Sequence, residues 1–139
     1  MRVRRKVLPV LEDELGPGVS GALARTADQL RADMELLDEL ALSAYAGLRG
    51  DALDDDSGLD ARALADLPPA TRSRVLRLAA LDAGAPASEL FHVHVNALGH
   101  LLVSTDPRGE VQLPGQVTAY LSAKGEDGRL RFRRTAVQG

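Results

Sequence analysis

The sequence predicts a mainly α domain of the α+β class, with several helices, a long central helix and a small antiparallel β-meander at its C-terminal end. Three observations predict it: apolar residues recur at helical spacing from residue 19 to residue 48, the composition is rich in Ala and Leu with only 3% aromatic residues, and the apolar period changes to two after residue 109. A chain of 139 residues is long enough for one domain with its own core. We therefore expect a single domain over residues 1–139, with a leading helical segment over 1–18, a helical core over 19–104 and the meander over 105–135.

The leading segment joins a basic run to an apolar series. Arg2, Arg4, Arg5 and Lys6 are followed by Val7, Leu8, Leu11 and Leu15. This pattern predicts a helix over residues 4–14 that ends at the Gly-Pro-Gly turn of residues 16–18. Proline has no backbone N–H to donate, so Pro9 either kinks this helix or lies in the first turn of a second helical piece.

The clearest predicted element is a helix over residues 19–48, with Ser20 as its N-cap. Its apolar residues are spaced alternately by four and three and form one stripe over about seven turns. Leu36, Leu40 and Leu42 lie off this stripe, so we expect the helix to be covered on more than one side and to be the spine for the other helices. The stripe consists of Leu23, Ala27, Leu30, Met34, Leu37, Ala41, Ala44 and Leu48.

The middle of the chain predicts an acidic loop over residues 50–58 and two helices over 59–67 and 70–83. The loop lacks the ligand order of an EF-hand, because the position that should carry the first acidic ligand is Leu53. Pro68 and Pro69 separate the two helices, and Gly84 ends the second. On the second helix, Arg74 and Arg77 are three residues apart and face the same way.

Arg72 lies on the other side of that helix, near its N-terminus, where a cation is unfavourable with the helix dipole. We therefore expect a partner for its side chain, and a structural role for it is an alternative to a binding role. Neither reading is decided by the sequence.

The segment from Ser88 to Leu102 can be read as a strand or as a helix. A strand would place His92 and His94 side by side as metal ligands, with His100 nearby, in a metal-dependent enzyme. A helix started by Ser88 has the longer apolar face, with Phe91, Val95, Leu98 and Leu102, so we predict the helix. On a helix His92 and His94 are about 200° apart and cannot bind one ion.

The C-terminal meander is predicted from alternation over three strands with turns at Pro114-Gly115 and at residues 124–128. One face carries apolar residues such as Val117 and Leu130 and packs on the helices. The opposite face carries Tyr120 and the arginines at 129, 131 and 133.

Motifs for catalysis are not visible in this sequence. It has neither a GxxxxGK[ST] nor a GxGxxG phosphate loop, and no G-x-S-x-G elbow. The absence of cysteine excludes disulfides and thiolate metal sites and fits a reducing cytoplasm, and no apolar run approaches the roughly 20 residues of a membrane span. The net charge of −3 is segregated into basic and acidic clusters, so a polyanion could meet the basic ones. Ordinary surface charge is the alternative.

Four segments together resemble the substrate-recognition domain of bacterial tRNA(Ile)-lysidine synthetases, a PP-loop family. They are RVRRKVLPVLEDELGPG, LARTADQLRADMELLDELA, LPPATRSRVLRLAALDAGA, and the pair EVQLPGQVTAY and DGRLRFR, in family order and at family-like spacing. Gln116 departs from the family pattern, which is LPGG, so the turn at that position is expected to differ. The high Ala, Arg, Asp and Leu content is typical of high-GC bacteria such as actinobacteria.

The resemblance implies an enzyme that uses ATP to attach lysine to the wobble cytidine of CAU-anticodon tRNA(Ile). The family's SGGxDS loop, which binds ATP, does not occur in this sequence. The resemblance therefore implies that ATP, Mg²⁺ and the catalytic residues belong to an N-terminal PP-loop catalytic domain that this chain lacks. It also implies that residues 1–18 are the inter-domain linker. No catalytic residue, metal site or cofactor is therefore expected in this chain. The implied partners are tRNA(Ile) and that catalytic domain.

Two hypotheses follow for the chain. In the first it docks tRNA, and the arginines and lysine contact backbone phosphates without reading sequence. In the second it is a helical interaction module that packs on a catalytic partner or on itself, and its arginines only aid solubility. The residues expected to bind tRNA are Arg4, Arg5, Lys6, Arg74, Arg77, Arg131 and Arg133.

Overall fold

A computed structural model describes residues 18–49, 58–106, 108–122 and 128–134. The chain forms two compact units, residues 1–37 and residues 38–139, which are described separately. The predicted helix over 4–14, most of the acidic loop and the turn at 124–127 lie outside the described residues. None of the helices in the described ranges combines the length and apolar character that crossing a bilayer requires.

The long helix predicted from the apolar stripe is confirmed as α2, Val19–Arg49. Its expected role as a spine covered on more than one side is wrong, because Ala41 is its only buried residue. Leu36, Leu40 and Leu42 are each at least half exposed. In the second unit, Ala44, Tyr45 and Leu48 pack against the core from one side of the helix. A single face of the last turns is enough, because the elements that follow α2 close a core among themselves.

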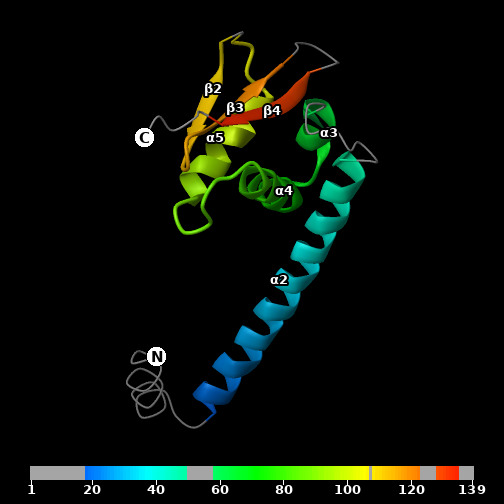
Figure 1. Cartoon of the computed structure of the whole chain (residues 1–139). Coiled ribbons are helices and arrows are strands. Elements are labelled where there is room, and N and C mark those ends of the chain that lie inside the picture. The colour runs from blue at the N-terminus through cyan, green and yellow to red at the C-terminus, as the bar shows by residue number, and fades with distance from the viewer. Residues whose placement is uncertain (1–17, 50–57, 107, 123–127, 135–139) are drawn as a thin grey trace. The chain divides into compact units, whose positions relative to one another are not determined.

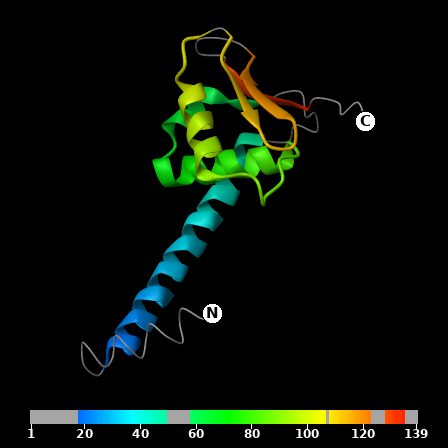
Figure 2. The same ribbon diagram turned by 90° about the vertical axis from the view of Figure 1, so that its left-hand side faces the viewer.

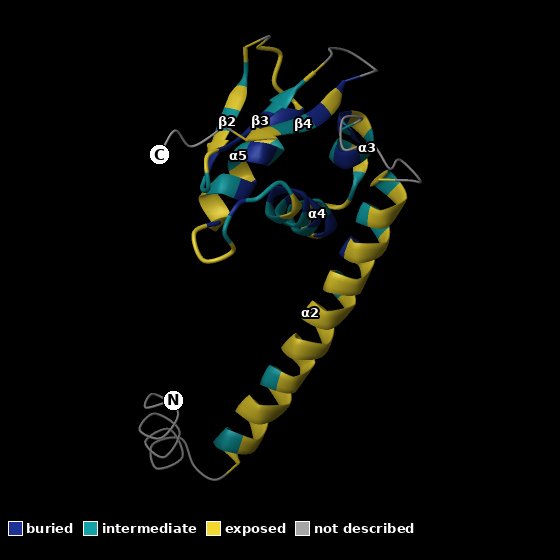
Figure 3. Ribbon diagram, in the orientation of Figure 1, coloured by how far each residue is buried: buried dark blue, intermediate teal, exposed yellow. Residues whose placement is uncertain are grey.

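That core lies between one face of an antiparallel sheet and the helices that cover it (Figures 1 and 2). The sheet has four strands in the order β1-β4-β3-β2, namely Leu59–Asp60, Arg129–Arg134, Val117–Leu121 and Glu110–Leu113. The helices of the second unit after α2 are α3 (Ala61–Asp66), α4 (Pro69–Asp82) and α5 (His92–Leu102). The inward faces of α3 and α5 are dark blue, which marks buried residues, in Figure 3. The largest fully buried side chains come from α3, α4, α5, β3 and β4 and are Leu64, Val75, Leu76, Leu98, Val117 and Leu130.

The predicted meander is confirmed in its three strands, and the sheet has a fourth strand, β1, that was not predicted. Residues 59–67 were expected to be one short helix, whereas Leu59 and Asp60 pair with Leu130 and Arg129 of β4 before α3 begins. Two residues are too few to show an alternating pattern. Asp60 then caps α3, because its carboxylate accepts hydrogen bonds from the backbone N–H groups of Arg62 (3.0 Å) and Ala63 (3.2 Å).

The helical reading of the histidine segment is confirmed by α5, but the helix starts after Ser88. Its N-cap is Phe91, whose backbone N–H donates to Nδ1 of His94 at 2.9 Å. Phe91 was expected on the buried face and is instead 62% exposed, because it precedes the first helical turn. Among the described residues, no group of three or more potential metal ligands comes together.

The turn between β2 and β3 fixes how the hairpin meets the loop before α5. Gly115 has a φ of 77°, and a Cβ there would lie 2.8 Å from Cδ of Pro86 and 2.9 Å from the carbonyl oxygen of Gly84. Gln116 also has a left-handed φ of 60°. This position therefore adopts a conformation that glycine accepts without strain, although the side chain is glutamine.

Candidate nucleic-acid interface

The outer face of the sheet gathers the basic residues of β4. In the observed register Tyr120 pairs with Arg131, and Thr118 pairs with Arg133. Side chains alternate across a strand, so these four residues share one face, while Ala119 and Leu130 turn to the core. The prediction that Tyr120 and the arginines lie opposite the apolar face is confirmed. The outer face consists of Asp60, Glu110, Gln112, Thr118, Tyr120, Arg129, Arg131 and Arg133.

Arg133 is held in place by two neighbours on this face. Its Nη2 donates to Oε1 of Glu110 at 2.6 Å, and its guanidinium carbon lies 5.2 Å from the centroid of the Tyr120 ring. The ion pair is charge-assisted, and the ring adds a cation–π attraction. The side chain remains about half exposed, at 53%. Arg133 is thus oriented while part of its guanidinium faces solvent.

Arg131 occupies the middle of the face, and its side chain has no ion pair or hydrogen bond within the described residues. Its Nε is covered and has no partner there. The side chain passes close to the backbone at Gly58, where a Cβ would lie 2.9 Å from Cγ of Arg131. Gly58 also has a φ of 70°, so a side chain at this position would be strained and would force its neighbours to shift.

The charge of the outer face is positive, with three arginines and two carboxylates. Asp60 accepts hydrogen bonds from α3, and Glu110 pairs with Arg133. Thr118 is only 3% exposed and its hydroxyl donates to Oε1 of Gln112 at 2.9 Å. The neutral part of the face is therefore internally hydrogen-bonded, and Arg129 and Arg131 have no acidic partner within the described residues.

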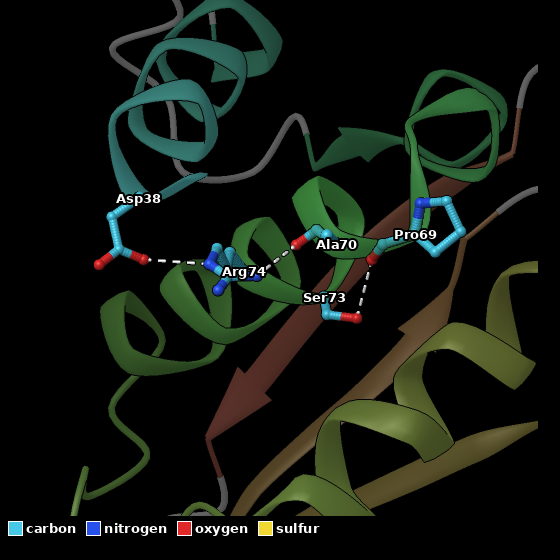
Figure 4. A network of polar contacts seen from close by, with 5 residues as sticks. All are labelled: Asp38, Pro69, Ala70, Ser73 and Arg74. Atoms are coloured by element: carbon cyan, nitrogen blue, oxygen red, sulfur yellow. Dashed lines mark hydrogen bonds and ion pairs between the residues drawn. The ribbon is translucent and has the colours of Figure 1, made fainter. Parts of the chain in front are cut away.

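The arginines of α4 are placed differently. Arg74 and Arg77 do face the same way, since both line a hollow of about 320 Å³ between α2 and α4. Nε of Arg74 donates to Oδ1 of Asp38 at 3.1 Å, and its Nη1 donates to the carbonyl oxygen of Ala70 in the same helix at 3.1 Å (Figure 4).

Arg77 is bound to the loop before α5. Its Nη1 donates to the carbonyl oxygen of Leu90 at 2.7 Å, and its Nη2 donates to that of Ala87 at 3.4 Å. Arg72, on the other side of α4, donates to the carbonyl oxygen of Ala65 at 3.0 Å, so the expected partner for it exists. These contacts join neighbouring segments of the backbone, and no pattern in the sequence indicates them.

The predicted binding residues thus fall into separate groups. Arg131 and Arg133 lie together on the outer face of the sheet, and Arg74 and Arg77 lie together on α4. The basic run at residues 4–6 lies outside the described residues. Glu110 and Gly58 were not among the predicted site residues, although they shape the outer face from segments distant in sequence.

The fold and this face define a small α+β domain whose sheet presents a basic outer face. A family model described as the TilS substrate binding domain matches residues 59–131, which is more than half of the chain. The chain belongs to this family. The match covers the second unit from β1 into β4, and so includes most of the outer face.

Curated relatives extend the match beyond these residues. The chain is 44% identical over 132 residues to a tRNA(Ile)-lysidine synthase of Streptomyces coelicolor, which covers 95% of this chain and 35% of the relative. It is 48% identical over 115 residues to one of Thermobifida fusca, with 82% and 34% covered, and 45% identical over 115 residues to one of Leifsonia xyli, with 83% and 34% covered. The chain spans about a third of the length of these relatives.

Proposed function

We propose that the chain docks tRNA(Ile) as the recognition domain of a tRNA(Ile)-lysidine synthase. In this proposal the whole enzyme uses ATP to attach lysine to the wobble cytidine of CAU-anticodon tRNA(Ile), and the chain positions the RNA without catalysing the reaction alone. ATP and Mg²⁺ act in the part of the enzyme that lies outside this chain. Family membership supports the role in substrate binding. The names of the relatives supply the substrate.

The outer face of the sheet is the observation that carries the proposal. It combines an oriented, half-exposed arginine at 133 with Arg131, which lacks an acidic partner within the described residues. Arginine presents planar donors that match phosphate oxygens, and its charge persists at all physiological pH values. Residues 131 and 133 are two apart on one strand, so about 7 Å separates them along the strand. This spacing is close to that of successive phosphates in a nucleic-acid strand.

Contacts of this kind explain docking rather than the reading of a sequence. Double-stranded RNA is recognised mainly through its shape, its phosphates and its 2′-hydroxyl groups. Phosphate contacts set position and orientation. We expect Tyr120 to keep Arg133 oriented, since its ring already lies against the guanidinium.

The other predicted residues rank below this pair. Arg74 and Arg77 already donate to Asp38 and to backbone carbonyls, so binding RNA would compete with these bonds. Arg4, Arg5 and Lys6 remain predictions from the sequence and its family resemblance. The linker role of residues 1–18 and contact with a catalytic domain also remain proposals.

Fluorescence anisotropy with labelled tRNA(Ile) tests the proposal. Binding should weaken steeply between about 50 and 200 mM salt, because released counterions drive the association. The Arg131→Ala/Arg133→Ala double variant should lose about tenfold in affinity and reduce the salt slope by about 1 to 2, since each lost phosphate contact removes its share of counterion release. Circular dichroism should show an unchanged fold.

The matched control removes the same charge elsewhere. Arg25 and Arg31 are exposed on α2, and the Arg25→Ala/Arg31→Ala variant should change affinity by less than about twofold. Equal losses in the two double variants, or binding that does not depend on salt, would contradict docking by the outer face. Salt-independent self-association seen by analytical ultracentrifugation, without RNA binding, would support the alternative of a helical interaction module.

A further inference from the structure

A second hollow lies on the helical side of the domain, among α3, α4 and α5. Its volume is about 280 Å³. The buried side chains of Leu76, Val95 and Leu102 form its apolar part. Its polar lining comes from Arg72, Ser73, Asn96 and His100. We call these residues together the helical pocket.

The polar side chains of the helical pocket offer both donors and acceptors. Arg72 uses one of its five N–H groups to hold the carbonyl oxygen of Ala65, which fixes the guanidinium at the wall and leaves further donors. The hydroxyl of Ser73 donates to the carbonyl oxygen of Pro69 at 2.9 Å, so its oxygen is left as an acceptor. Among the described residues, no carboxylate lines the pocket. The wall therefore suits a ligand that carries negative charge.

Asn96 and His100 stand one helical turn apart on α5, at the rim. Both are exposed, and neither side chain makes a hydrogen bond within the described residues. An amide and an imidazole are suited to bonding the polar edge of a planar base. The pocket thus has an apolar floor, two groups for a base edge and one for a phosphate.

Gly99 adds an independent observation. It lies inside α5, between the two rim residues, and a Cβ at this position would meet no atom within 4 Å. A glycine within a helix costs roughly 0.5–1 kcal/mol relative to alanine. Close packing within the described chain does not require glycine here. Its effect is to leave the pocket open beside Asn96 and His100.

We propose that the helical pocket receives one nucleotide of a single-stranded RNA segment. The base lies on Leu76, Val95 and Leu102 with its edge toward Asn96 and His100, and the phosphate lies near Arg72. A base stacked within a duplex could not present its face and edge to such a pocket, so the ligand must be an unstacked nucleotide. The RNA identity of the ligand rests on the proposed function, whereas the pocket is separate from the outer face of the sheet.

The test uses the whole chain with five probes: cytidine monophosphate, adenosine monophosphate, inorganic phosphate, a short single-stranded RNA and the corresponding duplex. NMR should show shifts of the His100 ring and the Asn96 side-chain amide with the nucleotides and the single strand. The duplex and inorganic phosphate alone should produce no comparable shift. Equal shifts with inorganic phosphate would overturn the nucleotide site, because the apolar floor would then have no role.

Two substitutions at one position give the matched pair. Gly99→Leu fills the pocket with a good helix former and should weaken binding of the single strand by about tenfold, equivalent to 1.4 kcal/mol. Gly99→Ala should keep affinity within about twofold while raising the melting temperature, since alanine stabilises a helix interior. Full binding by Gly99→Leu would overturn the proposal.

A second pair checks the polar rim. His100→Ala should weaken single-strand binding, whereas His92→Ala, on the same helix but outside the pocket lining, should not. Equal effects of the two histidine variants would contradict recognition at the rim. The Arg131→Ala/Arg133→Ala variant should still bind mononucleotides. If this variant binds mononucleotides and also binds tRNA(Ile) as tightly as the unchanged chain, the proposed docking face is wrong and the pocket proposal stands. If tRNA(Ile) binding depends on the two arginines but no nucleotide shifts the His100 signals, only the pocket proposal is wrong.

Discussion

The arginines of α4 and those of β4 look alike in the sequence and do different things in the structure. Arg72 and Arg77 of α4 donate to backbone carbonyls of neighbouring segments. Arg131 and Arg133 of β4 lie across an open sheet face, and only the second has an acidic partner among the described residues. Equal charge therefore does not imply equal availability for a ligand.

The difference has a physical origin in the backbone. The carbonyls that receive the α4 arginines belong to the last turn of α3 and to the loop before α5, where the helical hydrogen-bond ladder does not use them. Along β4, the backbone pairs with β3 from Leu130 to Arg134 and with β1 only at Arg129 and Leu130. Among the described residues, the side chains of Arg131 and Arg133 donate to no backbone carbonyl, so their donors remain for side chains or for a ligand.

The contrast between the arginines of α4 and those of β4 predicts its largest effect at Arg77, where a substitution should change stability and not RNA affinity. Arg77→Ala removes the donor to Leu90, a residue that is only 2% exposed, and should lower the free energy of unfolding by about 2 kcal/mol because a partly buried carbonyl loses a charged partner. Urea denaturation followed by circular dichroism measures this change. Affinity for tRNA(Ile), measured where the variant is folded, should stay within about twofold.

Arg77→Lys is the matched control, since it keeps the charge but cannot reach both carbonyls with a planar fork. It should recover only part of the lost stability. A variant at Arg77 that keeps full stability and loses RNA affinity would place α4 in the interface and remove the contrast with β4.

The sequence was informative about elements that repeat a pattern several times. The stripe in residues 19–48 predicted α2, and alternation in residues 110–133 predicted three strands and the face on which Tyr120 lies. Pro69 and Gly84 bounded α4 correctly within one residue. These signals are local, because each depends on spacing along a single segment.

What the sequence could not predict depends on contacts between distant segments. β1 has two residues and exists only because β4 pairs with it. The ion pair between Arg133 and Glu110 joins two outer strands of the meander through the register of β3. Burial of α2 was overestimated because an apolar stripe indicates a helix but not how many of its turns find a partner.

A smaller effect, which would sharpen the comparison, is expected at Glu110. Glu110→Gln removes a carboxylate from the outer face and releases Arg133 from its 2.6 Å ion pair. Affinity for tRNA(Ile) should rise about threefold, or roughly 0.7 kcal/mol, because a repulsive charge is lost and a guanidinium is freed. The anisotropy assay described for the arginine variants measures it. Glu89→Gln removes the same charge from the exposed loop before α5 and should have less effect. A decrease in affinity would mean that Glu110 orients Arg133 for the RNA.

The smallest expected effect concerns Arg74, which is intermediate between the arginines that bind backbone carbonyls and those that are open to a ligand. It donates to Asp38 and to its own helix, and the Arg74 side chain is 28% exposed while that of Asp38 is 65% exposed. A double-mutant cycle with Asp38→Ala and Arg74→Ala should give a coupling energy of about 0.5 kcal/mol, as is usual for a pair open to solvent. The cycle separates the energy of this ion pair from that of the hydrogen bond to Ala70, because the unchanged chain and the Asp38→Ala variant both keep Arg74 and therefore that bond. If Asp38 holds Arg74 away from RNA, Asp38→Ala should raise tRNA(Ile) affinity, and this gain should vanish in the double variant. A gain that persists without Arg74 would come from the lost carboxylate alone, and Arg74 would then belong with the structural arginines of α4.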